Sequence, residues 1–176
     1  MHRILVIGSG GAGKSTLATV LGDRLNLPVI HLDAHYWHPG WVATPGDEWR
    51  AHVAELIARD AWVMDGNYGG TLDQRLAACD TVVFLDLPRL VCLWRVLQRA
   101  LRYSGRSRPD MAPGCPEQIS WKFVWWIWTY PSRRRPDVLR RLSALPDSAR
   151  VVRLRSTREL AAFLSTVQKQ QLLEPQ

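Results

Sequence analysis

Cysteine is scarce in this chain of 176 residues, and its three cysteines, Cys79, Cys92 and Cys115, are far apart in the sequence. No C-x-x-C pair is present, which argues against a structural zinc site and against a disulfide framework. We therefore expect a protein of a reducing compartment, the cytoplasm.

Long apolar runs are absent as well. No apolar stretch approaches the roughly 18–20 residues that cross a bilayer, and the short apolar start of the chain reads as a strand rather than as a signal peptide. Hydrophobic residues still make up 47% of the composition, which is enough for a buried core. We expect one domain over residues 1–170, followed by a frayed tail at 171–176.

Acidic residues are too few to balance the basic ones, and the formal net charge is +7. The excess is concentrated in residues 89–141, which hold twelve Lys and Arg but only three acids. Such a surplus is typical of proteins that meet anionic ligands, nucleic acid or an anionic surface. Residues 27–48, in contrast, contain no Lys or Arg at all.

The strongest positive signal is a glycine-rich loop directly after the apolar, β-branched segment at residues 3–7. It reads G-x-x-x-x-G-K-S from Gly8 to Ser15, and helix-forming residues follow it. Glycines let several backbone N–H groups converge on one anion, and the start of the helix adds positive potential. We predict ATP binding, with Lys14 on the β- and γ-phosphates and Ser15 on Mg²⁺. The residues expected to hold the nucleotide are Gly8, Gly10, Gly11, Ala12, Gly13, Lys14, Ser15 and Thr16.

Short β-branched segments alternate with helical ones along the rest of the chain. Further strands are predicted at 29–32, 61–64, 81–85 and 149–154, and helices at 17–25, 47–59, 71–78, 90–103, 117–129, 132–145 and 157–168. Thr71 is expected to cap its helix, and residues 34–46 are expected to form a loop. This alternation predicts a parallel sheet with helices on both faces and ligands at the carboxyl ends of its strands. Asp33, Asp65 and Asp86 stand at such ends; for Asp86 the alternative is a turn-shaping role.

These motifs resemble the nucleotide-kinase branch of the P-loop proteins. The chain is also similar to the DNA topology modulation proteins, through the segments 65–68, 85–89, 106–117 and 126–131. The resemblance implies a P-loop NTPase three-layer sandwich with a five-stranded parallel sheet in the order 2-3-1-4-5. It further implies a lid-like insertion at about residues 104–117.

The resemblance also implies roles for charged residues. Ser15 and Asp65 would hold Mg²⁺, with Asp65 acting through water. Arginines that lead into the insertion would reach the transferring phosphate, and the candidates are Arg95, Arg99, Arg102, Arg106 and Arg108. Arg95, Arg99 and Arg102 share a helix face, although a solvated basic face would have the same spacing.

Asp33 carries the prediction about the phosphate acceptor. A carboxylate there can accept a proton from a hydroxyl group. The lack of cations at 27–48 weakens a nucleoside monophosphate as acceptor, because a phosphate would need arginines. The segment Asn67–Gly70 also weakens a nucleoside monophosphate as acceptor, because it stands where adenylate kinases have an arginine. Tyr36, Trp37 and Trp41 could stack on a ring of the acceptor or cover the core, and no metal is assigned to the nearby histidines.

Trp121, Trp125 and Trp128 recur at helical spacing and share one face. Three interpretations are open for this face: packing in the core or under the lid, a stacking platform for single-stranded nucleic acid, and contact with a membrane surface or partner. Together the residues predict a Mg-ATP-dependent kinase acting on a small, hydroxyl-bearing acceptor. The alternative is a nucleotide-regulated DNA-binding protein that affects DNA topology, although no helix-turn-helix is evident.

Overall fold

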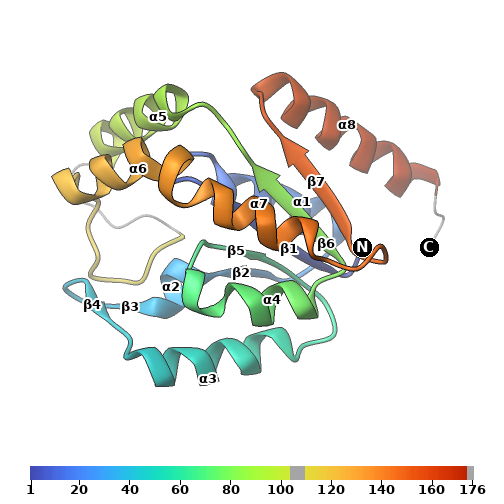
Figure 1. Ribbon diagram of the computed structural model, residues 1–176, viewed down its shortest axis with the longest axis horizontal. Coiled ribbons are helices and arrows are strands. Elements are labelled where there is room, and N and C mark those ends of the chain that lie inside the picture. The colour runs from blue at the N-terminus through green and yellow to red at the C-terminus, as the bar shows by residue number, and fades with distance from the viewer. Residues whose placement is uncertain (104–109, 174–176) are drawn as a thin grey trace.

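Five strands form a parallel sheet at the centre of the structure, a computed structural model that describes residues 1–103 and 110–173. They are β1 (Arg3–Gly8), β2 (Val29–His31), β5 (Trp62–Asp65), β6 (Thr81–Leu85) and β7 (Arg150–Leu154). They lie in the order β2-β5-β1-β6-β7 (Figure 1). Numbered along the chain, this order is 2-3-1-4-5, so the predicted fold class and strand order are confirmed.

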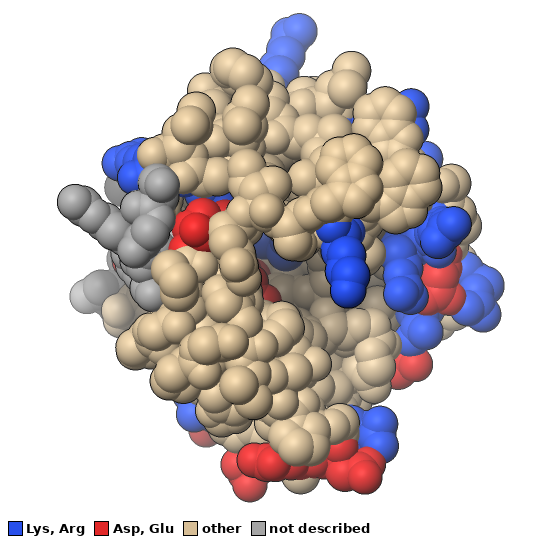
Figure 2. All heavy atoms as spheres, turned by 90° about the vertical axis from the view of Figure 1, so that its left-hand side faces the viewer, with Lys and Arg blue, Asp and Glu red and all other residues tan. Residues whose placement is uncertain are grey.

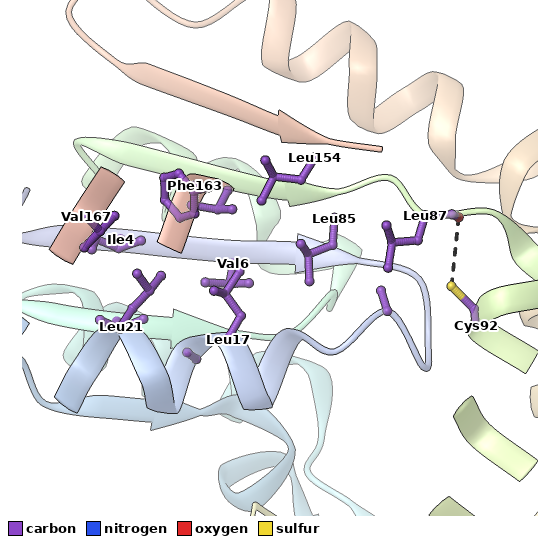
Figure 3. Close-up of a cluster of buried hydrophobic side chains, with 14 of the residues drawn as sticks. Ile4, Val6, Leu17, Leu21, Leu85, Leu87, Cys92, Leu154, Phe163 and Val167 are labelled. Atoms are coloured by element: carbon purple, nitrogen blue, oxygen red, sulfur yellow. Dashed lines mark hydrogen bonds between the residues drawn. The ribbon is translucent and has the colours of Figure 1, made fainter. Parts of the chain in front are cut away.

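Helices cover both faces of the sheet because side chains on β1 alternate between them. Ile4 and Val6 point to the face covered by α1 (Lys14–Leu25), α5 (Arg89–Arg102) and α8 (Thr157–Leu173), with α6 (Trp121–Arg133) beside α5. Leu5 and Ile7 point to the face covered by α3 (Gly46–Ile57), α4 (Leu72–Ala78) and α7 (Arg135–Ser143). Figure 3 shows the first of these two cores, with Leu17 of α1 against Val6.

Residues 34–46 do not form the predicted loop throughout. A short helix, α2 (Leu32–Tyr36), is followed by an antiparallel hairpin of β3 (Trp37–His38) and β4 (Val42–Ala43). The hairpin turns through Gly40 and Trp41, which both have positive φ. Asp33 therefore lies on the first turn of α2, two residues after the last residue of β2 rather than directly after a strand.

Several helix boundaries also differ from the prediction. Thr71 stands at the start of α4, at the end of a 3₁₀ turn (Gly69–Thr71), but its hydroxyl donates to the Tyr68 carbonyl at 3.1 Å. The predicted side-chain cap is therefore wrong, because that turn brings another acceptor within reach. The aromatic helix begins at Trp121 rather than at 117, since Ser120 caps it by accepting from the Phe123 N–H at 3.1 Å.

The last helix, α8, continues to Leu173 and so enters the segment predicted to fray. Residues 174–176 lie outside the described residues, as do residues 104–109 of the predicted insertion. None of the described helices is long and apolar enough to cross a membrane.

Candidate active site

A pocket of about 1440 Å³ opens at the carboxyl ends of the central strands. Figure 2 views the molecule from this side and shows a hollow near its centre, with charged side chains around it. The glycine loop, the first turns of α1 and the turn after β5 form part of its wall. Side chains of α5, α6, α8, the hairpin and residues 110–120 line other parts of it. Residues from both halves of the chain thus meet where the sequence predicts ligands.

The glycine loop is held from behind by α5. Gly11 has a φ of 73°, and a Cβ there would lie 2.2 Å from the Cys92 carbonyl oxygen. Arg95 donates from a guanidinium nitrogen to the Ala12 carbonyl at 3.0 Å. Arg95, a candidate for phosphate contact, thus supports the loop backbone itself. These contacts fix the backbone of the loop against α5.

Lys14 lies at the first position of α1 and lines the pocket. Its ammonium donates to the Ser9 carbonyl at 3.0 Å. Burial lowers the pKa of Lys14, while the negative charges of Asp33 and Asp65 oppose that effect. An incoming phosphate would add further compensating charge, which suits the predicted role of this residue.

Asp65 ends β5 and is fixed by two neighbours. The Ser15 hydroxyl donates to its Oδ2 at 2.8 Å, and the His31 Nδ1 lies 2.5 Å from its Oδ1. Burial lowers the pKa of His31, but the hydrogen bond and charge of Asp65 outweigh it, so the pKa is raised overall. A loop serine beside a strand-end aspartate is the pair that holds Mg²⁺ in P-loop NTPases. The described residues contain no cluster of three or more His, Cys, Asp and Glu for a metal, so phosphate oxygens and water would complete such a site.

Asp33 receives a hydrogen bond from the Tyr68 hydroxyl at 2.5 Å. Burial raises the pKa of Tyr68, and the charge of Asp33 raises it further, so the phenol stays protonated and donates. Within the part of the chain that the structure describes, this is the one hydrogen bond to the Asp33 carboxylate. Asp33 also lines the pocket. Its position allows the carboxylate to accept a proton from a bound hydroxyl.

Arg75 of α4 organises the turn after β5 from inside the protein. Its guanidinium is fully buried and donates to the carbonyls of Gly66, Asn67 and Tyr68 at 2.7–2.9 Å. Asn67 in turn accepts from the Gly8 N–H at 3.2 Å, which joins this turn to the glycine loop.

Three of these site residues were not given a role from the sequence. His31 could have been found, because it is directly opposite Asp65 in the parallel pairing of β2 with β5. Tyr68 stands in a recognised motif, but its contact with Asp33 crosses 35 residues. Arg75 carries no local signal, since an arginine on a short helix normally lies in solvent.

Contact of the arginines with a phosphate stays a prediction, and the structure gives the positions of those that it describes. Arg99 lines the pocket and forms an ion pair with Glu117, with Nη2 at 2.8 Å from Oε1. Arg102 lines the pocket as well. Arg106 and Arg108 lie outside the described residues.

Asp86 is not part of the pocket lining. Its carboxylate binds Arg153 at 2.6 Å and Arg135 at 2.9 Å. Asp86 thus ties α7 to the end of β7, and a structural role fits it better than a catalytic one.

The aromatic residues around Asp33 divide into two sets. Tyr36 packs against Trp49 and Tyr68, with ring centroids 5.0 and 4.6 Å apart, and belongs to the core. Trp37 and Trp41 contact each other edge to face at 5.3 Å and line the pocket. Tyr36 thus follows the alternative of a cover over the core, while the stacking of Trp37 and Trp41 on a ligand ring stays a prediction.

Residues 110–117 lie against the hairpin. The Gly40 N–H donates to the Gly114 carbonyl at 3.0 Å, and the Trp41 indole donates to the Pro116 carbonyl at 3.2 Å. The Cys115 thiol contacts the His38 carbonyl at 3.2 Å. The described part of the predicted insertion thus closes one side of the pocket.

The tryptophan face of α6 points away from the core. Trp121 is 77% exposed, and Trp125 and Trp128 are also exposed. Phe123 and Trp126, on the other side of the helix, line the pocket. The interpretation of this tryptophan face as core packing is therefore wrong, because periodicity shows that residues share a face but not which way it points.

The strand order, the helices on both faces and the glycine loop give this chain the α/β fold of the P-loop kinases. Shikimate kinase from Acinetobacter baumannii in complex with shikimate is similar in structure, with a TM-score of 0.57 and 17% identity over 98% of this chain and 94% of that one. Shikimate kinase from Bacteroides thetaiotaomicron has a TM-score of 0.54 and 18% identity, covering 99% of both chains. A putative kinase from Chloroflexus aurantiacus has a TM-score of 0.52 and 16% identity, over 96% and 98%.

No model of a protein family matches the sequence. The uncharacterized protein YqaC of Bacillus subtilis (strain 168) is 30% identical over 132 residues, which cover 73% of this chain and 72% of that protein. The chain belongs to the same family as YqaC. The resemblance to the DNA topology modulation proteins stays a prediction.

Proposed function

We propose that this protein is a Mg-ATP-dependent phosphotransferase that transfers the γ-phosphate of ATP to a hydroxyl group of a small acceptor. One observation carries the proposal: Lys14, Ser15 and Asp33 line one pocket, and the Ser15 hydroxyl is hydrogen-bonded to Asp65 at the end of β5. A phosphate grip, a magnesium site and a carboxylate base are the parts that phosphoryl transfer to a hydroxyl requires.

Each residue has a distinct task in this proposal. The N–H groups of the glycine loop and the Lys14 ammonium bind the β- and γ-phosphates. Ser15 and Asp65 hold Mg²⁺, which neutralises charge on the phosphates when bound. The oxygen of the acceptor hydroxyl forms a bond to the γ-phosphorus, and Asp33 takes the proton of that hydroxyl. The bond between the γ-phosphorus and the bridging oxygen breaks, and ADP leaves. Tyr68 holds Asp33 in position throughout.

The acceptor side of the pocket favours a hydroxyl compound over a nucleoside monophosphate. The side chains that line it include His31, Asp33, Asn67, Tyr68, Trp37 and Trp41. None of these six is Lys or Arg, which are the residues that bind a second phosphate group. Rings and polar groups in this combination suit a small polar molecule that carries an apolar face. The structural likeness to shikimate kinases agrees with this class of reaction.

The test is ATP consumption with Mg²⁺ against a panel of nucleosides, nucleoside monophosphates and small alcohols. We expect one hydroxyl-bearing compound to stimulate turnover, and Lys14→Ala to abolish it while the circular dichroism spectrum stays unchanged. Lys122→Ala, which removes an exposed lysine on α6, is the matched control. Unchanged turnover in Lys14→Ala would refute the proposal.

The role of Asp33 is tested separately. Asp33→Asn should slow transfer to the acceptor by about 10²–10⁴-fold while ATP binding is retained. Asp47→Asn is the control, because the Asp47 side chain is 94% exposed. Acceptor phosphorylation near the wild-type rate in Asp33→Asn would show that Asp33 is not the base.

A further inference from the structure

Large apolar side chains are concentrated on the outer side of α5 and α6. On α5 the exposed set is Leu90, Trp94, Leu97 and Leu101, at i, i+4, i+7 and i+11. On α6 it is Trp121, Trp125 and Trp128. We call these seven residues the Trp/Leu face.

The two halves of the Trp/Leu face belong to neighbouring helices. α5 and α6 pack against each other, and the Arg89 guanidinium lies 3.9 Å from the centre of the Trp128 ring. Figure 1 shows the two helices together at the top of the molecule, and in Figure 2 uncharged side chains cover much of that region. Monomeric soluble proteins rarely expose so many large apolar residues together, and such patches mark interaction surfaces.

The charged side chains of α5 and α6 are all positive. Neither α5 nor α6 contains Asp or Glu. Their exposed cations are Arg89, Arg102, Lys122 and Arg133. The partner of the Trp/Leu face must therefore offer apolar surface together with negative charge.

A second copy of this chain does not supply that negative charge. In a two-fold dimer the same surface meets itself, so the basic residues of one copy would face those of the other. Single-stranded nucleic acid fits less well, because it binds by stacking bases on rings. The α5 half of the face is mostly leucine, and the ring of Trp128 already lies under Arg89.

An anionic lipid surface meets both requirements. Amphipathic helices lie in such a surface with Leu and Trp at the boundary between headgroups and acyl chains, and with Arg and Lys at the phosphates. Each basic residue near the surface adds electrostatic attraction. We propose that the Trp/Leu face docks this protein on anionic phospholipid membranes, with α5 and α6 lying along the surface.

This docking does not depend on the proposed kinase activity. The pocket is lined by other side chains of the same helices, including Arg95 and Arg99 of α5 and Phe123 of α6. Substitutions on the Trp/Leu face therefore leave the predicted nucleotide site in place. Binding to membranes and binding of ATP can be measured independently.

The experiment is co-sedimentation of the full chain with vesicles of phosphatidylcholine alone and with vesicles of equal parts phosphatidylcholine and phosphatidylglycerol. We expect binding to the anionic vesicles at least about tenfold tighter than to the neutral ones, weakened by salt, with a blue shift of tryptophan fluorescence. The double variant Trp94→Ser/Trp121→Ser should lose most of this binding and keep ATP binding. Val42→Ser removes an exposed apolar side chain of β4 and should bind like the wild type.

Four outcomes would overturn the proposal. One is no binding to anionic vesicles, and another is equal binding by the double variant and the wild type. A third is a concentration-dependent dimer in sedimentation that the double variant abolishes, because a second copy then covers the face. The last is variant-sensitive binding of a single-stranded oligonucleotide without binding of vesicles.

Discussion

Arg75 offers the sharpest test of how the site is supported. Its guanidinium donates to four backbone carbonyls, those of Gly66, Asn67, Tyr68 and Thr71. Hydrogen bonds from a charged donor contribute about 1.5–3 kcal/mol each, so the four give roughly 6 kcal/mol at the lower end. Burial lowers the pKa of Arg75 to about 10, and a shift of this size corresponds to a cost of ~3 kcal/mol for the buried charge. The net contribution to the free energy of unfolding is then about 3 kcal/mol.

Arg75→Met keeps most of the side-chain volume and removes all donors. We expect urea denaturation to show the loss of about 3 kcal/mol, and thermal melting to show a Tm lowered by roughly 6–12 °C, at 2–4 °C for each kcal/mol in a protein of this size. Arg75→Lys should be intermediate, because an ammonium group keeps the charge but cannot span four carbonyls.

Arg158→Met, at an exposed position on α8, is the control and should melt like the wild type. The acceptor-dependent rate should fall with Arg75→Met as well, since Asn67 and Tyr68 lose their support. A loss of stability below ~1 kcal/mol would refute this account. All four hydrogen bonds of Arg75 together would then contribute no more than one ordinary hydrogen bond does.

Three other substitutions test separate parts of the structure. Two backbone N–H groups at the start of β1 and a neighbouring hydroxyl hold the pKa of Asp80 below its usual range despite burial, so Asp80→Asn should cost about 1–3 kcal/mol at neutral pH. That deficit should vanish as the pH falls through the lowered pKa, and a deficit that persists in acid would contradict the assignment. Gly11→Ala should weaken ATP binding in calorimetry, because its Cβ would lie 2.2 Å from the Cys92 carbonyl oxygen; affinity equal to the wild type would show that the loop need not pack on α5. Tyr68→Phe should lower kcat for the acceptor and spare ATP binding, since it removes the hydrogen bond to Asp33; an unchanged kcat would show that this bond does not position the carboxylate.

The sheet and the glycine loop were predictable because their signals are local. A β-branched run followed by G-x-x-x-x-G-K-S specifies strand, loop and helix within 15 residues, and the structure has β1, the loop and α1 in those places. The position of Asp33 in the pocket and the contact of Asp65 with Ser15 also follow from the sequence, since carboxyl ends of parallel strands share one edge.

What the sequence could not show are contacts that depend on the completed fold. The hydrogen bond from Tyr68 to Asp33 needs β2 and β5 side by side, and the buried position of Arg75 needs the turn at 66–68 to exist first. The tryptophan face shows a different limit. The spacing of the tryptophans shows that they share one face of the helix. The same spacing is found whether that face points into the core or outward.

The hairpin of β3 and β4 gives the pocket a wall with its own folding behaviour. Its contacts with residues 114–116 join parts of the chain about 75 residues apart, and the hairpin pairs over only two positions on each strand. Contacts between such distant segments form late because the intervening chain must first be ordered. A short hairpin with few buried side chains also opens at low cost. Amide hydrogens of β3 and β4 should therefore exchange with solvent faster than those of β1 and β6, so that the acceptor wall opens and closes while the sheet and the glycine loop stay folded.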